Sequence, residues 1–324
     1  MEENTEQRTD LTLFFEKIQE LKDQIATVIV GQERMIDLVL TAILANGHVL
    51  IEGVPGVAKT LLARLTARLI DANFSRIQFT PDLMPSDVLG TTVFNMKTNE
   101  FDFHRGPVFA DMVLVDEINR APAKTQAALF EVMEERQVSI DGTTHRMGDL
   151  YTILATQNPV EQEGTYKLPE AQLDRFLMKI TMEYPTLEEE VHILERHHAN
   201  ASLVKLDTVK PVITRSELLS LRGWMDKVFV DRTLLQYIAL IVQQTRTSKS
   251  VYLGASPRAS VAMLQTSKAY ALLQGRDFVT PEDIKFVAPY VLQHRLILTA
   301  EAEMEGFSPV KVTQRLIDKV EVPK

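Results

Sequence analysis

The loop Gly53–Thr60, with the sequence Gly-Val-Pro-Gly-Val-Ala-Lys-Thr, constrains the fold of this chain more than any other segment. It follows a short apolar segment of strand character, His48–Glu52, and leads into a Leu- and Ala-rich segment of helical character, Thr60–Leu69. Glycines in such a loop let the backbone curl, so that successive N–H groups point at one anion. The sequence therefore predicts a phosphate-binding loop between a strand and a helix. The alternative is a glycine-rich strand-to-helix turn without a ligand.

The last residues of this loop have side chains suited to a nucleotide. We expect Lys59 to neutralise the β and γ phosphates and the Thr60 hydroxyl to bind Mg²⁺. Ala58 stands where the general pattern has its second glycine, and its methyl group is tolerable only if the residue has helical dihedrals. The candidate cofactor-binding residues of the loop are Gly53, Val54, Pro55, Gly56, Val57, Ala58, Lys59 and Thr60.

A second motif supplies the acids that such a site requires. The apolar segment Met112–Val115 is followed by Asp116 and Glu117. We expect Asp116 to hold Mg²⁺, directly or through water, and Glu117 to polarise the water that attacks the γ-phosphate. Taken alone, the motif could be a buried strand with two solvated acids at its end. Together with the loop, it indicates one sheet that presents both strand ends to a common crevice.

Strand-like and helical segments alternate over the first part of the chain and predict a parallel sheet with helices on both faces. After Tyr184-Pro185 strand signals almost disappear and helix starts become frequent. We therefore divide the chain into a disordered, solvated tail (1–10), an α/β core (11–185) and a helical domain (186–324). The further strand-like segments are Arg76–Phe79, Met112–Asp116, Tyr151–Thr156 and Lys179–Tyr184. The helix starts are Thr186-x-x-Glu189, Thr214-x-x-Glu217, Ser256-Pro257 and Thr280-Pro281.

Composition narrows the class of protein. The formal net charge of −9 and the sequence pI near 5.4 give no general attraction to nucleic acid or anionic lipid, so a nucleic-acid partner is not expected. The absence of cysteine excludes disulfides and thiolate chemistry. The longest apolar stretches, such as Leu38–Ala45, are too short to span a bilayer, and the first residues do not resemble a signal peptide. We expect a cytoplasmic protein without membrane insertion.

Three further residues are candidate site residues because of their positions in the sequence. Asn158 follows the strand-like segment ending at Thr156, where its amide could orient a water molecule or simply begin an Asn-Pro turn. Arg258 lies in the first turn of an expected helix, where the dipole disfavours a cation, so an anion is expected nearby. Arg175, in Leu-Asp-Arg-Phe, and Arg258 could equally be ordinary surface arginines.

The chain resembles AAA+ ATPases and, within them, is similar to the MoxR family. The likeness covers roughly residues 11–300 and rests most strongly on the run Ala155–Phe176. The other motifs that carry it are Val30–Gln32, Gly53–Thr60 and Asp116–Pro122. The alanine at position 58 is usual in this family. The resemblance implies a P-loop AAA+ core, with a five-stranded parallel sheet, followed by an all-α lid domain.

The same resemblance assigns roles to individual residues. It implies that Asn158 is the sensor of the γ-phosphate, that Arg175 is an arginine finger reaching the neighbouring subunit, and that Arg258 is a second sensor at the base of a lid helix. Val30, Gly31 and Gln32 would lie along the adenine. A finger acting in trans implies a homo-oligomer, most simply a hexameric ring. Whether Arg258 acts within its own subunit or across the interface is left open.

Two segments with alternating apolar and polar residues predict β-hairpins. Thr91–Phe103 would turn at Thr98-Asn99, and Gln137–Arg146 would turn at Asp141-Gly142. The group that contains magnesium-chelatase ATPase subunits and MCM helicases has hairpins that face the pore or the substrate. The alternative is that both are surface ribbons that only pack on the sheet.

The expected function is that of a Mg²⁺-dependent, MoxR-type ATPase, which hydrolyses ATP to ADP and phosphate. The resemblance implies a chaperone-like remodelling machine that matures protein complexes or metalloenzymes, with a von Willebrand factor A-domain partner and a client protein. The alternatives are a magnesium-chelatase-like ATPase subunit, an MCM-like nucleic-acid motor and a small-molecule P-loop kinase.

Overall fold

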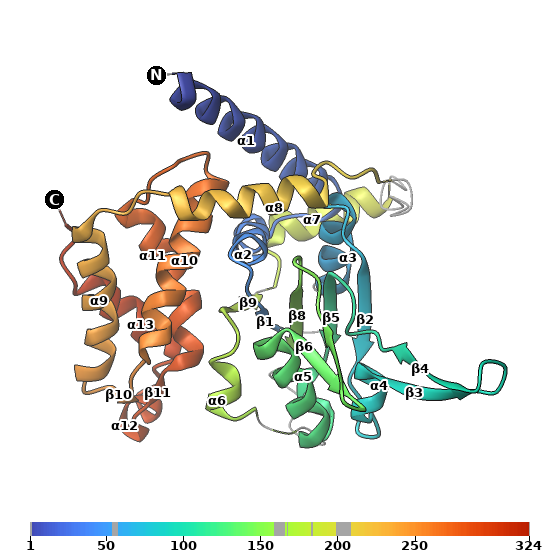
Figure 1. Ribbon diagram of the computed structural model, residues 1–324. Helices are drawn as coiled ribbons and strands as arrows, with labels where there is room; N and C mark the ends of the chain where they lie inside the picture. The colour runs from blue at the N-terminus through green and yellow to red at the C-terminus, as the bar shows by residue number, and fades with distance from the viewer. Residues whose placement is uncertain are drawn as a thin grey trace.

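A five-stranded parallel sheet with strand order β2-β5-β8-β1-β9 forms the centre of the protein (Figure 1). The computed structural model describes residues 2–53, 58–158, 166, 168–182, 184–198 and 209–323, and only the backbone of residues 2–10. All five strands lie where the sequence predicts them. Their bounds are Val49–Gly53 (β1), Phe74–Gln78 (β2), Met112–Asp116 (β5), Thr152–Gln157 (β8) and Met178–Met182 (β9).

The central strands are buried on both faces, which is why they read as continuous apolar runs in the sequence. Side chains alternate between the faces: Leu114 and Leu154 belong to one hydrophobic cluster, and Val113 and Ile153 to the other. Helices α2 and α3 cover the first face, and α5 covers the second. These helices span Glu33–Leu44 (α2), Lys59–Leu69 (α3) and Ala123–Glu135 (α5). The predicted layering of helices on both faces is confirmed.

The C-terminal part is a helical bundle that packs beside the β9 edge of the sheet (Figure 1). Its buried side chains join the same hydrophobic cluster as α2 and β9, so the lid is continuous with one layer of the core. The lid helices are Arg232–Thr247 (α9), Pro257–Leu273 (α10), Pro281–Leu292 (α11), Ala300–Met304 (α12) and Pro309–Asp318 (α13), with 3₁₀ turns at Met225–Lys227 (η3) and Gln293–Arg295 (η4). A short antiparallel ribbon of β10 (Val251–Leu253) and β11 (Ile297–Leu298), which the sequence did not predict, lies within this all-helical setting.

The helices between sheet and lid begin at predicted caps. In the first, Thr186 N–H donates to Glu189 Oε2 at 2.8 Å and Glu189 N–H donates to Thr186 Oγ1 at 3.3 Å. The pair Thr214 and Glu217 makes the same capping box. These helices are α7 (Leu187–His198) and α8 (Arg215–Trp224). The last strand of the sheet ends at Met182, just before these helices begin.

The N-terminal helix α1 spans Glu2–Val28. It therefore includes residues that the sequence assigned to a solvated tail, and its buried Leu21 and Ile25 pack on the core. None of the described helices is both long and apolar enough to cross a membrane. The remaining short elements are Pro85–Leu89 (α4), Ile118–Arg120 (η1) and Glu170–Leu173 (α6).

Both predicted hairpins are confirmed. The first, β3 (Gly90–Asn95) and β4 (Glu100–Arg105), projects away from the body of the protein (Figure 1). The second, β6 (Gln137–Ile140) and β7 (Thr143–Arg146), turns through Asp141 and Gly142 with φ of 49° and 78°. Two consecutive positive φ angles are the signature of the tight turn that matches strand twist.

Candidate functional site

The candidate phosphate-site residues meet at the carboxyl ends of three adjacent strands. Lys59 and Thr60 begin α3 after the loop that follows β1, Asp116 ends β5 and Glu117 follows it, and Asn158 follows β8. Because β5, β8 and β1 are neighbours and parallel, these side chains share one edge of the sheet. The loop residues Val54, Pro55, Gly56 and Val57 lie outside the described residues.

Lys59 is turned toward the start of the loop and toward the acids. Its Nζ donates to the Gly53 carbonyl at 2.6 Å. Burial lowers the pKa of Lys59, while the carboxylates of Asp116, Glu117 and Glu52 oppose that shift. The ammonium group is therefore close enough to the strand-end acids to feel their charge, as a residue binding between phosphate and metal must be.

Ala58 corrects one expectation. It has φ 58° and ψ 22°, in the left-handed region, where the sequence analysis required right-handed helical dihedrals for a methyl group. A left-handed conformation costs a non-glycine residue about 1–2 kcal/mol. Ala58, the residue before α3, nevertheless adopts it.

Thr156, which the sequence analysis missed, joins the two acids. Its Oγ1 donates to Asp116 Oδ1 at 3.1 Å and accepts from the Glu117 N–H at 3.0 Å. Glu117 has φ 56°, so the chain turns sharply after Asp116 and sends the two carboxylates in different directions. The hydroxyl thus fixes the geometry of the acid pair from the neighbouring strand.

Strand β2 supplies further partners to the acids. Arg76 Nε lies 2.6 Å from Asp116 Oδ2, and Gln78 Nε2 donates to Glu117 Oε2 at 2.8 Å. Arg120 Nη1 also lies 3.0 Å from Glu117 Oε2. Arg76 and Gln78 are two residues apart on one strand, the spacing that places both on the same face. The sequence shows that spacing, but it does not predict that β2 lies next to β5.

Gly31 and Gln32 precede α2, near the β9 side of the same edge. Gly31 has φ +66°, and a Cβ built on it would lie 2.1 Å from Glu189 Oε1. Glu189 is in the first turn of α7, the helix that follows β9. The positive φ favours a glycine at position 31, and an added Cβ would meet the flexible end of the Glu189 side chain.

Arg175 lies at the opposite edge of the sheet. It precedes β9, and two residues later Leu177 N–H donates to the His48 carbonyl, at the amino end of β1. Because β1 and β9 run parallel, five residues of strand separate this edge from the carboxyl edge, a length of about 17 Å. Within one chain, Arg175 is thus remote from Lys59.

Arg258 joins Arg175 at the amino edge. Glu134, near the end of α5, places Oε2 3.0 Å from Arg175 Nη2 and Oε1 3.4 Å from Arg258 Nη2. It is the anion that the position of Arg258 predicted. The Arg258 side chain is 66% exposed and that of Arg175 is 29% exposed, so the two guanidinium groups form a cationic pair accessible from solvent.

The residues at the carboxyl edge fit a nucleoside triphosphate with its divalent cation. Lys59 supplies an ammonium group, Thr60 a hydroxyl at a helix start, and Asp116 and Glu117 two carboxylates at an adjacent strand end. Their placement after parallel strands, together with a helical lid, defines the class as a P-loop nucleotide-binding protein.

Comparison with known proteins supports the assignment to the P-loop nucleotide-binding class. Residues 48–178 match the model of the ATPase family associated with various cellular activities (AAA), and residues 243–319 match the AAA lid domain. The chain is 47% identical to the uncharacterized protein YeaC of Bacillus subtilis, over 93% of each chain. It is 44% identical to Chaperone MoxR1 of Mycobacterium tuberculosis, over 93% of this chain and 81% of that one.

A crystal structure of a candidate ATPase from Cytophaga hutchinsonii superposes with a TM-score of 0.91 at 41% identity, over 100% of both chains. The chain belongs to the MoxR family of AAA+ ATPases.

Proposed function

We propose that this protein hydrolyses ATP to ADP and phosphate at a site made by two subunits. The carboxyl edge of one subunit would bind the nucleotide, and Arg175 and Arg258 of the next subunit would complete the site. The observation that carries the proposal is the separation of the candidate residues onto opposite edges of one parallel sheet. A closed assembly in which each carboxyl edge meets a neighbour's amino edge would use every candidate residue.

At the carboxyl edge, Lys59 would neutralise the β and γ phosphates, and Thr60 and Asp116 would hold Mg²⁺. The metal, when bound, supplies Lewis-acid polarisation and charge neutralisation at the phosphates. Glu117 would orient and polarise the attacking water, and Asn158 would help to align it. Gly31 and Gln32 would lie along the adenine. The Lys59 ammonium, already drawn toward both acids, supports this arrangement.

Glu117 must be free to face that water. In the described structure its Oε2 accepts from Gln78 and Arg120 at 2.8 Å and 3.0 Å. A base held in this way turns its charge toward protein donors rather than toward a substrate. We infer that turnover requires Glu117 to leave these partners.

The shared carboxylate of Glu134 argues that both arginines act across the interface. Since Glu134 contacts Arg175 and Arg258 together, the two guanidinium groups lie close to each other at the amino edge. Arg258 would then act in trans with Arg175, on the neighbour's phosphates, where an arginine can stabilise transition-state charge. A heterologous contact of this kind closes into a ring, most simply a hexamer.

The wider role would be chaperone-like remodelling in the cytoplasm. The 44% identical relative is described as a chaperone. The projecting β3–β4 hairpin exposes Phe94, Met96 and Phe101 by 44%, 90% and 73%, a surface suited to a client protein. A von Willebrand factor A-domain protein would be the partner, and maturation of a protein complex or metalloenzyme the outcome.

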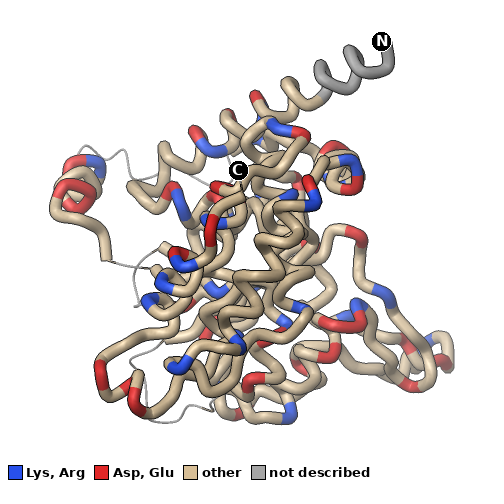
Figure 2. Tube along the Cα trace, turned by 90° about the vertical axis from the view of Figure 1, so that its left-hand side faces the viewer, with Lys and Arg blue, Asp and Glu red and all other residues tan. Residues whose placement is uncertain are grey.

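A nucleic-acid motor fits the charges poorly. The formal net charge is −9, and in the view of Figure 2 basic and acidic residues are interspersed along the chain. Proteins that track a phosphate backbone gather positive charge along one face.

Phosphate release tests the proposed chemistry. Lys59→Ala and Glu117→Gln should each lower the turnover of ATP by at least about 100-fold, because the first removes a charge that acts on the phosphates and the second removes the base that acts on the attacking water. Lys285→Ala, an exposed lysine on α11, is the matched control and should leave turnover unchanged. Full activity of Glu117→Gln would contradict the assignment. Mass photometry with and without an ATP analogue should show assembly only when the nucleotide is bound.

A further inference from the structure

We propose that Arg295 is the positioning residue that joins the core segment bearing Arg175 to the lid, which bears Arg258, and so fixes the two arginines relative to each other. This inference rests on the proposed function, in which those two arginines act on a neighbouring subunit. Arg295 lies in η4, directly after α11, and so belongs to the lid. Nothing in its sequence context suggests a role at the nucleotide.

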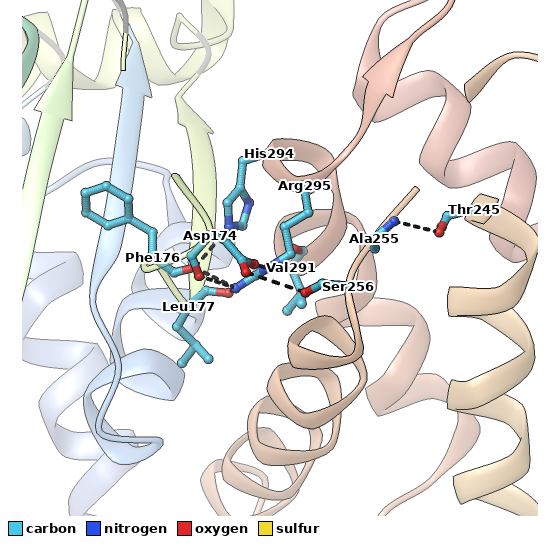
Figure 3. Close-up of polar contacts among 9 residues, drawn as sticks. All are labelled: Asp174, Phe176, Leu177, Thr245, Ala255, Ser256, Val291, His294 and Arg295. Atoms are coloured by element: carbon cyan, nitrogen blue, oxygen red, sulfur yellow. Dashed lines mark hydrogen bonds and ion pairs between the residues drawn. The ribbon is translucent and has the colours of Figure 1, made fainter. Parts of the chain in front are cut away.

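Arg295 forms an ion pair and several hydrogen bonds with the segment that contains Arg175 (Figure 3). Its Nε lies 2.6 Å from Asp174 Oδ1, and its Nη2 donates to the carbonyls of Asp174 and Phe176 at 3.3 Å and 2.8 Å. These carbonyls belong to the two residues that flank Arg175 in the chain. Nη1 donates to the Leu177 carbonyl at 3.2 Å and also to that of Val291 within the lid. The planar guanidinium thus contacts three residues of the core, Asp174, Phe176 and Leu177, which bracket Arg175.

The same network reaches the start of the lid helix that carries Arg258. Ser256, the N-cap of α10, donates from Oγ to Asp174 Oδ2 across a long 3.5 Å contact (Figure 3). The residue before it, Ala255, donates its N–H to Thr245 Oγ1 of α9 at 3.0 Å. One carboxylate, that of Asp174, therefore contacts both Arg295 and the α10 start, two residues from Arg258.

His294 adds a third contact from η4 to this segment. Its ring lies in Figure 3 beside Arg295, with Nε2 3.0 Å from the Phe176 carbonyl. Burial and the neighbouring Arg295 charge hold the pKa of His294 well below its usual value, so the ring is neutral and donates from Nε2. The lid therefore fixes residues 174–177 by contacts from two consecutive side chains.

Burial makes this network rigid. The Arg295 side chain is only 4% exposed, and the Asp174 side chain is 21% exposed. A guanidinium removed from water must keep its donors satisfied, and its fixed fork prescribes where the acceptors lie. Arg175 and Arg258, in contrast, reach outward from this base to Glu134. The buried Arg295 therefore sets the positions of Arg175 and Arg258 relative to each other.

Steady-state kinetics give the first test. Arg295→Gln and Arg295→Lys should lower kcat by about 10- to 100-fold, the cost of misplacing a catalytic group by about 1 Å, and leave the KM for ATP within about twofold. The lysine variant should not restore activity, because an ammonium group cannot reproduce the fork.

The matched control is Arg276→Gln, which breaks the 2.6 Å pair with Asp283 inside the lid and contacts neither arginine. It should leave kcat and KM unchanged. An equal loss of kcat in the control would assign the effect to lid stability and overturn the proposal.

Mixed assemblies distinguish a role of Arg295 in positioning the arginines for a neighbouring subunit from an effect on the nucleotide site of its own subunit. Glu117→Gln subunits cannot turn over ATP but keep their arginines. Mixed with Arg295→Gln subunits, they should restore turnover to the level obtained with Arg175→Ala subunits, because they supply correctly placed arginines to an intact site. If Arg295→Gln gives no soluble protein, Asp174→Asn takes its place.

Rescue of Arg175→Ala but not of Arg295→Gln or Asp174→Asn would overturn the positioning role. Rescue of none of the three would overturn the composite site, and this inference with it.

Discussion

At the scale of the residue, Thr156 decides how the two acids are presented. Its hydroxyl bridges Asp116 Oδ1 and the Glu117 N–H, although it lies on a different strand from both. The sequence identified the acids because their chemistry is local: two carboxylates directly after a buried strand. It missed Thr156 because the bridge depends on the register between β5 and β8.

We predict that Thr156→Val lowers kcat about tenfold, because it leaves the Glu117 N–H without its acceptor and loosens Asp116. Thr152→Val is the control on the same strand, since the Thr152 hydroxyl is buried and has no hydrogen-bond partner among the described residues. That change should leave kcat unchanged and stability equal or higher. Parallel ATPase and urea-unfolding measurements check both variants.

The buried histidine at the amino end of β1 makes stability depend on pH. His48 Nδ1 accepts from the Ile153 N–H at 3.0 Å and its Nε2 donates to the Met133 carbonyl at 3.1 Å. Burial, aided by the Arg136 charge, lowers the pKa of His48 to about 3. The folded state thus excludes a proton that the unfolded chain binds below its ordinary pKa of about 6.5. The stabilisation is complete above that value and is lost as pH falls toward 3.

We predict that the free energy of unfolding falls by about 2 kcal/mol between pH 7 and pH 5 on account of His48. His48→Gln should remove that part of the pH dependence. His197→Gln, on the exposed face of α7, should keep it. Urea titrations at both pH values measure the difference, and equal slopes for the two variants would refute the assignment.

At the scale of the element, local patterns predicted what the backbone does nearby. The apolar runs gave all five strands, and the Asp141-Gly142 turn and the Thr214 and Glu217 pair gave a hairpin and a helix start. The sequence did not predict the short β10–β11 ribbon, because its two strands are brief and lie far apart in the chain. The left-handed backbone conformation of Ala58 was not predicted, because alanine is a strong helix former and its sequence gives no sign of such a conformation.

The junction of α2 and α7 gives a prediction at this scale. Gly31→Ala would place a methyl group 2.1 Å from Glu189 Oε1 at a backbone φ of +66°. We expect the Kd for an ATP analogue to rise about tenfold, since the strain of order 1–3 kcal/mol displaces the segment proposed to line the adenine.

The control is Gly223→Ala, in α8, where the added methyl group meets nothing within 4 Å. A helix-interior glycine replaced by alanine should stabilise slightly and leave the Kd unchanged. Unchanged affinity in Gly31→Ala would place the adenine elsewhere.

At the scale of the whole molecule, the candidate residues lie at two opposite edges of the sheet. The sequence singled out Lys59, the two acids and both arginines, and the family resemblance implied that Arg175 acts on a neighbouring subunit. Their places on the two edges could not be read from local patterns, because strand order and parallel direction are set by contacts between distant segments. The contacts of Arg175 and Arg258 with Glu134 likewise bring together three segments that are distant in the sequence. No local sequence pattern predicts these contacts. Within one chain, the two arginines therefore lie at the opposite edge of the sheet from Lys59 and the two acids.

The central claim is that each site takes its arginines from a neighbour. We would mix Glu117→Gln and Arg175→Ala subunits in varying ratios and measure phosphate release. Each variant alone should be inactive. Mixtures should regain activity with a maximum near equal proportions, because only there does an intact acid most often face an intact arginine. Mixtures that stay inactive at every ratio, although native gels confirm that the subunits co-assemble, would contradict the composite site.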